Sequence, residues 1–67
     1  MHIGNSIKAF QNETGTPSVK MAKSLGVTPQ QFSRWRSSKD LKLSIVVASA
    51  AVLGVSPGEL IDRAKGL

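Results

Sequence analysis

Gln30, Ser33 and Arg34 carry side chains that form directional hydrogen bonds, and their spacing puts them on one side of a helix. The aromatic residues Phe32 and Trp35, three positions apart, occupy the other side and are expected to face the protein core. A glutamine amide pairs with adenine N6 and N7, and an arginine guanidinium with guanine O6 and N7. Each good pair contributes about 1 to 3 kcal/mol of discrimination. Gln30 and Arg34 are therefore the main candidates for base recognition, with Ser33 as an adaptable third contact.

Simpler interpretations exist for these residues. Gln30 and Ser33 are ordinary exposed helix residues, and Arg34 is also suited to a surface ion pair. Pro29 has no side-chain donor, so it would touch a thymine methyl group or only set the approach of the helix. The ring of Trp35 suggests base stacking, but its spacing from the other aromatic ring favours a place in the core.

The chain offers little to a catalytic or metal site. It has no cysteine, His2 is its single histidine, and its four acidic residues are scattered over the first predicted helix, one connection and the fifth predicted helix. It also lacks a glycine-rich phosphate loop, so no nucleophile and base can be paired. We therefore expect no enzyme activity, no metal and no cofactor, and the lack of cysteine is compatible with a reducing cytoplasm.

Residues 18–37 are predicted to form two short helices joined by one tight turn. Gly26 ends the first helix, and Thr28 starts the second as its N-cap. Pro29 suits the first helical position, and Gln31 completes a T-x-x-Q capping box. The pattern is typical of a helix-turn-helix, which presents its second helix to a DNA major groove.

A first amphipathic helix is predicted over residues 3–13, because Ile3, Ile7 and Phe10 recur at helical spacing. Its polar face is expected at Asn5, Lys8 and Gln11.

Thr16 is then predicted to cap the next helix, with Pro17 at its first position. The apolar surface of that helix is expected at Val19, Met21, Ala22 and Leu25.

A fourth helix, predicted over residues 43–53, is apolar nearly all round and should be largely buried. One face is suited to the core: Leu43, Val46, Ala50 and Leu53. The opposite stripe is small and uncharged, and we expect it to form a homodimer contact together with the fifth helix, or to be merely a surface of low charge. It consists of Ser44, Val47, Ala48 and Ala51, continued by Val55.

The segments 24–32 and 52–60 share the same pattern, in which a helix-ending glycine is followed by an N-cap residue and a proline. Both are therefore possible helix-turn-helix corners. Ser56 and Glu59 form a second capping box at the start of a fifth helix over residues 57–65. Because acidic residues open this fifth helix and would repel phosphate, we expect the first corner to contact DNA and the second to serve packing.

The net charge of +5 is concentrated in residues 18–42, which hold six lysines and arginines against one aspartate. This distribution indicates a surface that faces a polyanion, although a solvated face of a small protein is the alternative. Phosphate contacts are expected from amide groups at the start of the second helix and from Thr16, Ser18, Lys20, Ser37, Ser38, Lys39 and Lys42.

Composition predicts one all-α domain over residues 1–67, since so short a chain buries only about 60% of its unfolded surface. Its apolar residues are mostly Leu, Ile, Val and Ala. The first ten residues do not resemble a secretory signal. The longest uncharged span, residues 43–58, has an apolar part shorter than the roughly 20 residues that cross a bilayer. We therefore expect no membrane contact, and we expect a cytoplasmic location.

The run IGNSIKAFQNETGTPSVKMAKSLGVTPQQFSRWRS, followed by LKLSIVVASAAVLGVSPGEL, resembles the DNA-binding domain of phage lambda-type repressors and Cro proteins. The resemblance covers nearly the whole chain and implies a compact five-helix domain with its helix-turn-helix at about residues 17–37. Two departures stand out. Ser18 stands where members of this family commonly have a glutamine that binds a phosphate. Arg36, Ser37 and Ser38 stand where the family commonly has an acidic residue, Asn and Gly after the third helix.

Together these features predict a sequence-specific transcriptional regulator, a phage or prophage repressor of the Cro kind that occupies a double-stranded DNA operator in the nucleoid of a bacterial host. A chain of 67 residues leaves no room for a sensor domain, so no small-molecule effector is expected. Two half-sites about 34 Å apart favour a homodimer, weak or assisted by DNA. The alternative is a helical protein-binding module, of an antitoxin or anti-repressor kind, that uses the apolar fourth helix.

Overall fold

The computed structural model describes residues 1–67 and contains five helices and no strands. The predicted boundaries are confirmed to within one residue at each helix end. The helices are α1 (Ile3–Thr14), α2 (Ser18–Leu25), α3 (Pro29–Ser37), α4 (Leu43–Leu53) and α5 (Pro57–Lys65).

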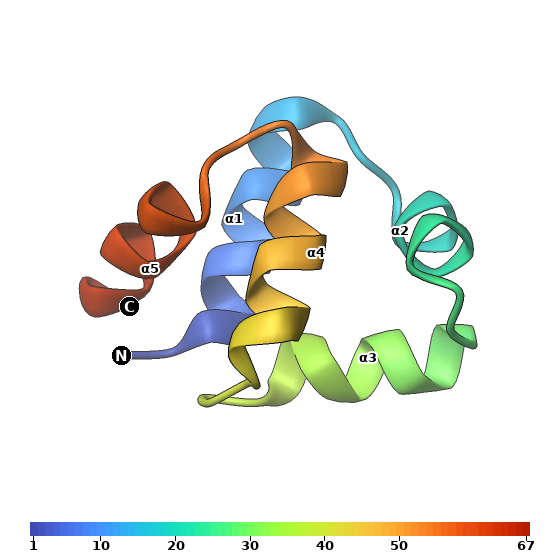
Figure 1. Ribbon diagram of the computed structural model, residues 1–67, viewed down its shortest axis with the longest axis horizontal. Helices are drawn as coiled ribbons and strands as arrows, with labels where there is room; N and C mark the ends of the chain where they lie inside the picture. Colours follow the sequence, from blue (N-terminus) through green and yellow to red (C-terminus); the bar gives the residue numbers. More distant parts are fainter.

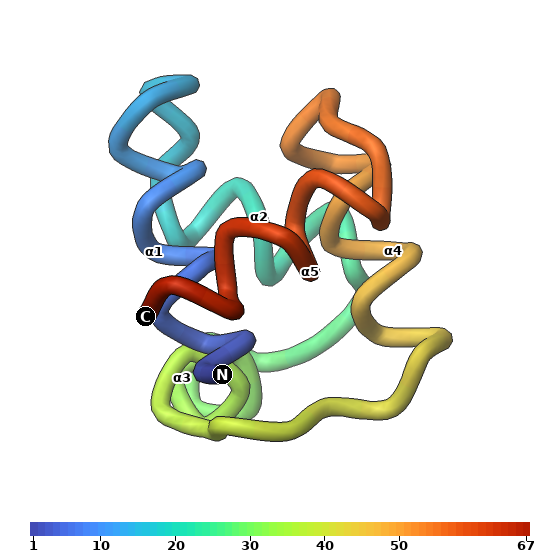
Figure 2. The backbone as a smooth tube through the Cα atoms, turned by 90° about the vertical axis from the view of Figure 1, so that its left-hand side faces the viewer, coloured from blue at the N-terminus to red at the C-terminus, as the bar shows by residue number.

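α1 and α4 stand side by side in the middle of the molecule, and α3 crosses beneath them (Figure 1). α2 lies on one side of this central pair and α5 on the other. α1 packs against α3, α4 and α5, whereas α2 packs against α3 and α4. The view in Figure 2 looks along α3, which passes below the rest of the fold. The two ends of the chain meet, because the amide of His2 donates to the carbonyl of Ala64 at 3.1 Å.

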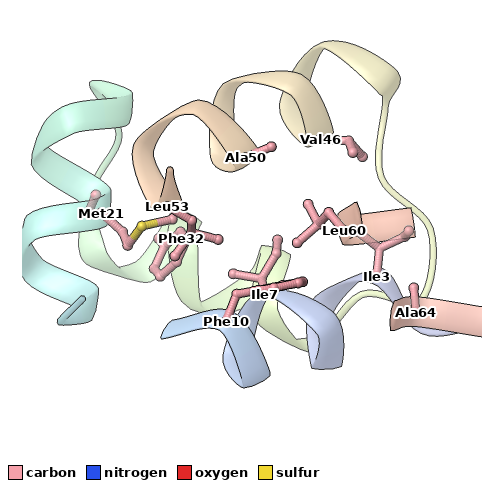
Figure 3. Packing of buried hydrophobic residues seen from close by; sticks show 11 residues of the cluster. Ile3, Ile7, Phe10, Met21, Phe32, Val46, Ala50, Leu53, Leu60 and Ala64 are labelled. Atoms are coloured by element: carbon pink, nitrogen blue, oxygen red, sulfur yellow. The ribbon is translucent and has the colours of Figure 1, made fainter. Parts of the chain in front are cut away.

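The core draws on all five helices, and Figure 3 shows its side chains converging. Phe32 is 1% exposed and meets Met21 and Leu53 at the end of the core nearest α2. Trp35 is only half-buried and packs against this cluster from outside. The expected inward side of α3 is thus confirmed for Phe32 and in part for Trp35. The buried apolar residues are Ile3, Ile7, Phe10, Met21, Ala22, Phe32, Val46, Ala50, Leu53, Leu60 and Ala64.

Two apolar residues that the sequence analysis placed at the core are exposed. Leu43 is 67% exposed, because the buried stripe of α4 begins one turn later and includes Ser49 rather than Leu43. Val19 is 72% exposed. It precedes the buried Met21 by two positions, which is a rotation of about 200° around the helix, so it points away from the core. The prediction for Leu43 was wrong because helical spacing does not show where the neighbouring elements end, whereas the prediction for Val19 was wrong because its own helical position lies opposite Met21.

The repeated glycine-cap-proline pattern forms two equivalent corners, one between α2 and α3 and one between α4 and α5. At the first corner the amide of Val27 donates to the carbonyl of Ala22, and at the second Val55 donates to Ala50, both at 3.0 Å. The glycine of each corner has a left-handed backbone, with φ of 70° and 75°, which favours glycine. α4 and α5 together have the length and apolar composition of a membrane span but are bent by 106°, and no single helix has them.

Candidate nucleic-acid interface

The start of α3 is fixed by Thr28, as the sequence predicts. The Thr28 hydroxyl accepts the amide of Gln31 at 3.1 Å, and its carbonyl accepts the amide of Phe32 at 3.0 Å. The reciprocal bond of the capping box does not form, since the Gln31 side chain is exposed and makes no hydrogen bond within the protein. Only half of the predicted box therefore exists, and the Gln31 amide remains available.

The other end of α3 is held by the first turn of α1. The amide of Gly4 donates to the carbonyl of Ser38, and the amide of Ile3 donates to the carbonyl of Lys39, both at 2.9 Å. A β-carbon at Gly4 would lie 2.3 Å from the carbonyl oxygen of Arg36, so only glycine allows this approach. Sequence reasoning missed Gly4 because the contact is tertiary; its only local signal is a glycine inside a predicted helix.

The predicted base-reading residues lie together on the outer side of α3. All four are exposed, and the side chains of Gln30, Ser33 and Arg34 make no hydrogen bond or ion pair within the protein. The alternative interpretation, in which Arg34 pairs with a surface carboxylate of the same chain, does not hold in the structure. Pro29 adjoins them at the first helical position.

Charge pairing divides the molecule into two parts. The two ion pairs, Glu13 with Arg63 and Asp62 with Lys65, involve only α1 and α5. By contrast, no basic residue between positions 18 and 42 has an acidic partner, although Asp40 lies in the same segment. The unpaired cations there are Lys20, Lys23, Arg34, Arg36, Lys39 and Lys42.

The start of α2 differs from the sequence prediction. Pro17 is the N-cap, not the first helical residue, and Thr16 does not cap the helix because it lies one position too early. Its hydroxyl contacts the hydroxyl of Thr14 at 2.7 Å instead. Proline has no side-chain acceptor, so the amides of residues 18–20 have no hydrogen-bond partner. An uncapped helix start with free amides attracts anions.

The remaining predicted phosphate contacts differ in what they offer. Lys20, Lys39 and Lys42 are exposed cations. The hydroxyls of Ser37 and Ser38, however, donate to carbonyls one turn earlier in α3, at 3.3 Å and 2.8 Å. Their hydrogens are thus already engaged within the protein.

Gln11 was expected on the polar face of α1 but is only 6% exposed. Its amide nitrogen donates to the carbonyl of Thr16 at 3.1 Å and to the hydroxyl of Ser18 at 3.2 Å. Its amide oxygen is buried without a partner. A polar residue therefore holds the start of α2 from inside the fold.

An open hollow lies between α1 and α5, on the side of the molecule away from α2. It is lined by Glu13, Glu59, Asp62, Arg63, Phe10 and Gly66. The Arg63 guanidinium binds the Glu13 carboxylate through two contacts and stacks 4.6 Å from the centre of the Phe10 ring. The hydrogen bond from Arg63 holds the pKa of Glu13 below its ordinary value. The hollow thus holds three carboxylates and one guanidinium.

The uncharged stripe of α4 is exposed at all four predicted positions: Ser44, Val47, Ala48 and Ala51. Val47 is 46% exposed. Leu43, which was predicted to face the core but is exposed, lies one turn before it on the same side of the helix. The exposed apolar surface of α4 is therefore larger than the sequence predicted.

No protein-family model, curated protein or solved structure matches this chain.

Proposed function

We propose that the protein is a sequence-specific regulator that binds double-stranded DNA with α3 in the major groove. On this proposal α2 and α3 form a helix-turn-helix at residues 17–37, and the domain is of the lambda-repressor type. One observation carries it. The basic and amide side chains of residues 18–42 have no partners within the protein, whereas the ion pairs are confined to α1 and α5. Unpaired donors concentrated in one segment suit a polyanionic ligand.

The base contacts follow from the free donors of α3. Arg34 would bind guanine O6 and N7, and Gln30 would bind adenine N6 and N7. Ser33 lies between them and accommodates either a donor or an acceptor. Pro29 would approach a thymine methyl group. The corner before α3 is bonded to α2 through Val27 and Ala22, and the far end of α3 is bonded to α1, so these side chains would be presented at a constant tilt.

Backbone contacts would come from Lys20, Lys39 and Lys42 and from the free amides of α2. Each neutralised phosphate releases counterions, so the logarithm of the affinity should fall with the logarithm of salt concentration by about 0.9 per phosphate. A repressor at an operator that overlaps a promoter, in the cytoplasm of a bacterial host, is the regulatory role that such binding supports.

The test is selection from random duplexes, followed by binding assays with Gln30→Ala and Arg34→Ala. Each variant should lose preference at one base pair and bind the selected site roughly 5-fold to 150-fold more weakly, as about 1 to 3 kcal/mol requires. Lys8→Ala, which removes a cation outside the basic segment, should keep the preference intact. Unchanged base preference in both α3 variants would reject the assigned contacts.

For the exposed stripe of α4 we propose a second copy of this chain as the occupant. The stripe is uncharged, so two copies meet there without repulsion, and a dyad-related pair suits two half-sites. Ala48→Glu should leave the fold intact and weaken self-association in sedimentation velocity, while Asn12→Glu, at an exposed position of α1, should not weaken it. Equal sedimentation of both variants and the wild type at high concentration would contradict this contact.

The alternative, a protein-binding module that docks through α4, makes a different prediction about salt. Docking of apolar surfaces changes little as salt rises, whereas phosphate contacts weaken steeply. Absence of duplex binding at low salt, together with binding to a protein partner whose affinity does not change with salt, would favour the protein-binding module.

A further inference from the structure

The hydroxyl groups near the basic surface are not equivalent as phosphate donors. A hydroxyl has one hydrogen to donate. In Ser37 and Ser38 that hydrogen is engaged with the carbonyls of Ser33 and Arg34. Neither serine can donate to DNA without giving up a bond within α3.

The same count applies at the start of α2. Thr14 donates its hydroxyl hydrogen to the carbonyl of Phe10 at 2.7 Å. The contact between the Thr14 and Thr16 hydroxyls, also 2.7 Å, therefore takes its hydrogen from Thr16. Thr16 has no hydrogen left for a phosphate.

Ser18 differs from these residues because its hydroxyl hydrogen is not engaged within the protein, and its contact with Gln11 explains why. The Gln11 amide nitrogen has two hydrogens, of which one goes to the Ser18 hydroxyl oxygen and the other to the carbonyl of Thr16. Ser18 is therefore an acceptor toward the protein interior, and its own hydrogen finds no acceptor in the protein. The backbone strengthens this connection, since the amide of Thr16 donates to the carbonyl of Gln11 at 3.0 Å.

The Gln11 amide oxygen is an unpartnered acceptor but is buried, and the free groups that remain at the start of α2 are donors. They comprise the Ser18 hydroxyl, the amides of residues 18–20 and the exposed ammonium of Lys20, at the positive end of the α2 dipole. An oxyanion with several acceptor oxygens satisfies such a group, and a DNA phosphate is the one that lies beside a bound α3.

We propose that Gln11 is a positioning residue for one DNA phosphate, which is bound by the Ser18 hydroxyl and the first amides of α2. This inference rests on the proposed DNA binding and specifies which hydroxyl contributes. Gln11 itself touches no DNA: it is buried, and it acts by fixing the orientation of Ser18 and of the residues before it.

The experiment uses the selected duplex with single phosphates replaced by neutral methylphosphonates. For the wild type, one replacement per half-site should weaken binding roughly tenfold or more, as loss of a hydrogen bond to a charged group implies. In Ser18→Ala and in Gln11→Met, which keeps the side-chain length but removes both donors, this penalty should shrink at that position alone. The double variant should bind no more weakly than the weaker single variant. Ser37→Ala is the matched control and should keep the wild-type profile.

A profile of Gln11→Met that retains the full penalty at every position, with uniformly weaker binding, would overturn the proposal and leave Gln11 a purely structural residue. Circular dichroism and thermal unfolding verify that the variant folds. If the wild type binds no duplex at all, the proposed function fails and this inference fails with it. A wild type that binds, with an unaltered profile in both variants, rejects the inference alone.

Discussion

Replacing Gly4 by alanine tests whether α3 is held in place by the first turn of α1. The new β-carbon would lie 2.3 Å from the Arg36 carbonyl oxygen and 2.8 Å from that of Ser38. The two backbones must separate by at least 0.7 Å before the closer contact reaches 3.0 Å. That movement stretches the two hydrogen bonds, from Gly4 and Ile3, that join α1 to the end of α3.

Overpacking of this kind typically costs about 1 to 3 kcal/mol, and each weakened hydrogen bond costs about 1 kcal/mol more. The better helix propensity of alanine returns about 0.5 to 1 kcal/mol. We therefore expect a net loss of about 2 to 4.5 kcal/mol, which is a large share of the roughly 3 to 10 kcal/mol that a domain of this size has. In a chain this short the loss corresponds to a fall in Tm of roughly 10 to 35 °C.

Gly58→Ala is the matched control, because Gly58 also lies within a helix but its β-carbon would meet only the Ser56 hydroxyl, at an ordinary 3.8 Å. This variant should be as stable as the wild type or slightly more stable. Thermal unfolding by circular dichroism measures both. Equal Tm values for Gly4→Ala and Gly58→Ala would refute the proposed attachment of α3.

Two further predictions concern buried serines and the ion pair of α1 and α5. Ser49 is fully buried and its hydroxyl has no partner, so Ser49→Ala should raise Tm. Ser6, equally buried, donates to the Leu60 carbonyl at 2.6 Å, so Ser6→Ala should lower Tm by the loss of about 1 kcal/mol. A rise for both, or a fall for both, in thermal unfolding would contradict this distinction. The pKa of Glu13 is lowered by its hydrogen bond from Arg63, so the ion pair stabilises the fold above pH 4.5 and is lost as the pH falls through the lowered native pKa. Glu13→Gln should thus lower Tm at pH 7 and have progressively less effect below pH 4.5; a constant difference across the titration would count against it.

The helix ends were predictable because their signals are local. Gly26 allows the left-handed backbone that closes α2, and the threonine and proline at positions 28 and 29 fix the start of α3 whatever surrounds them. The burial of Phe32 and the exposure of Gln30 and Arg34 follow from helical spacing within α3. The candidate site was accessible to sequence reasoning for the same reason.

The features that sequence reasoning missed depend on contacts between distant segments. Gly4 is required only because the end of α3 passes against it, and Gln11 is buried only because the start of α2 folds over it. Leu43 is apolar yet exposed, since the buried stripe of α4 begins only one turn later. Hydrophobic spacing predicts which residues share a face but not how far that face is covered.

The most direct test of DNA binding through α2 and α3 is a titration of the isotopically labelled protein with the selected duplex, followed by amide chemical shifts. We predict that the largest changes fall at the start of α2 and along the exposed side of α3, at residues 18–20 and at Gln30, Ser33 and Arg34. Changes confined to α4, or to the hollow between α1 and α5, would contradict the account, as would an unchanged spectrum at low salt.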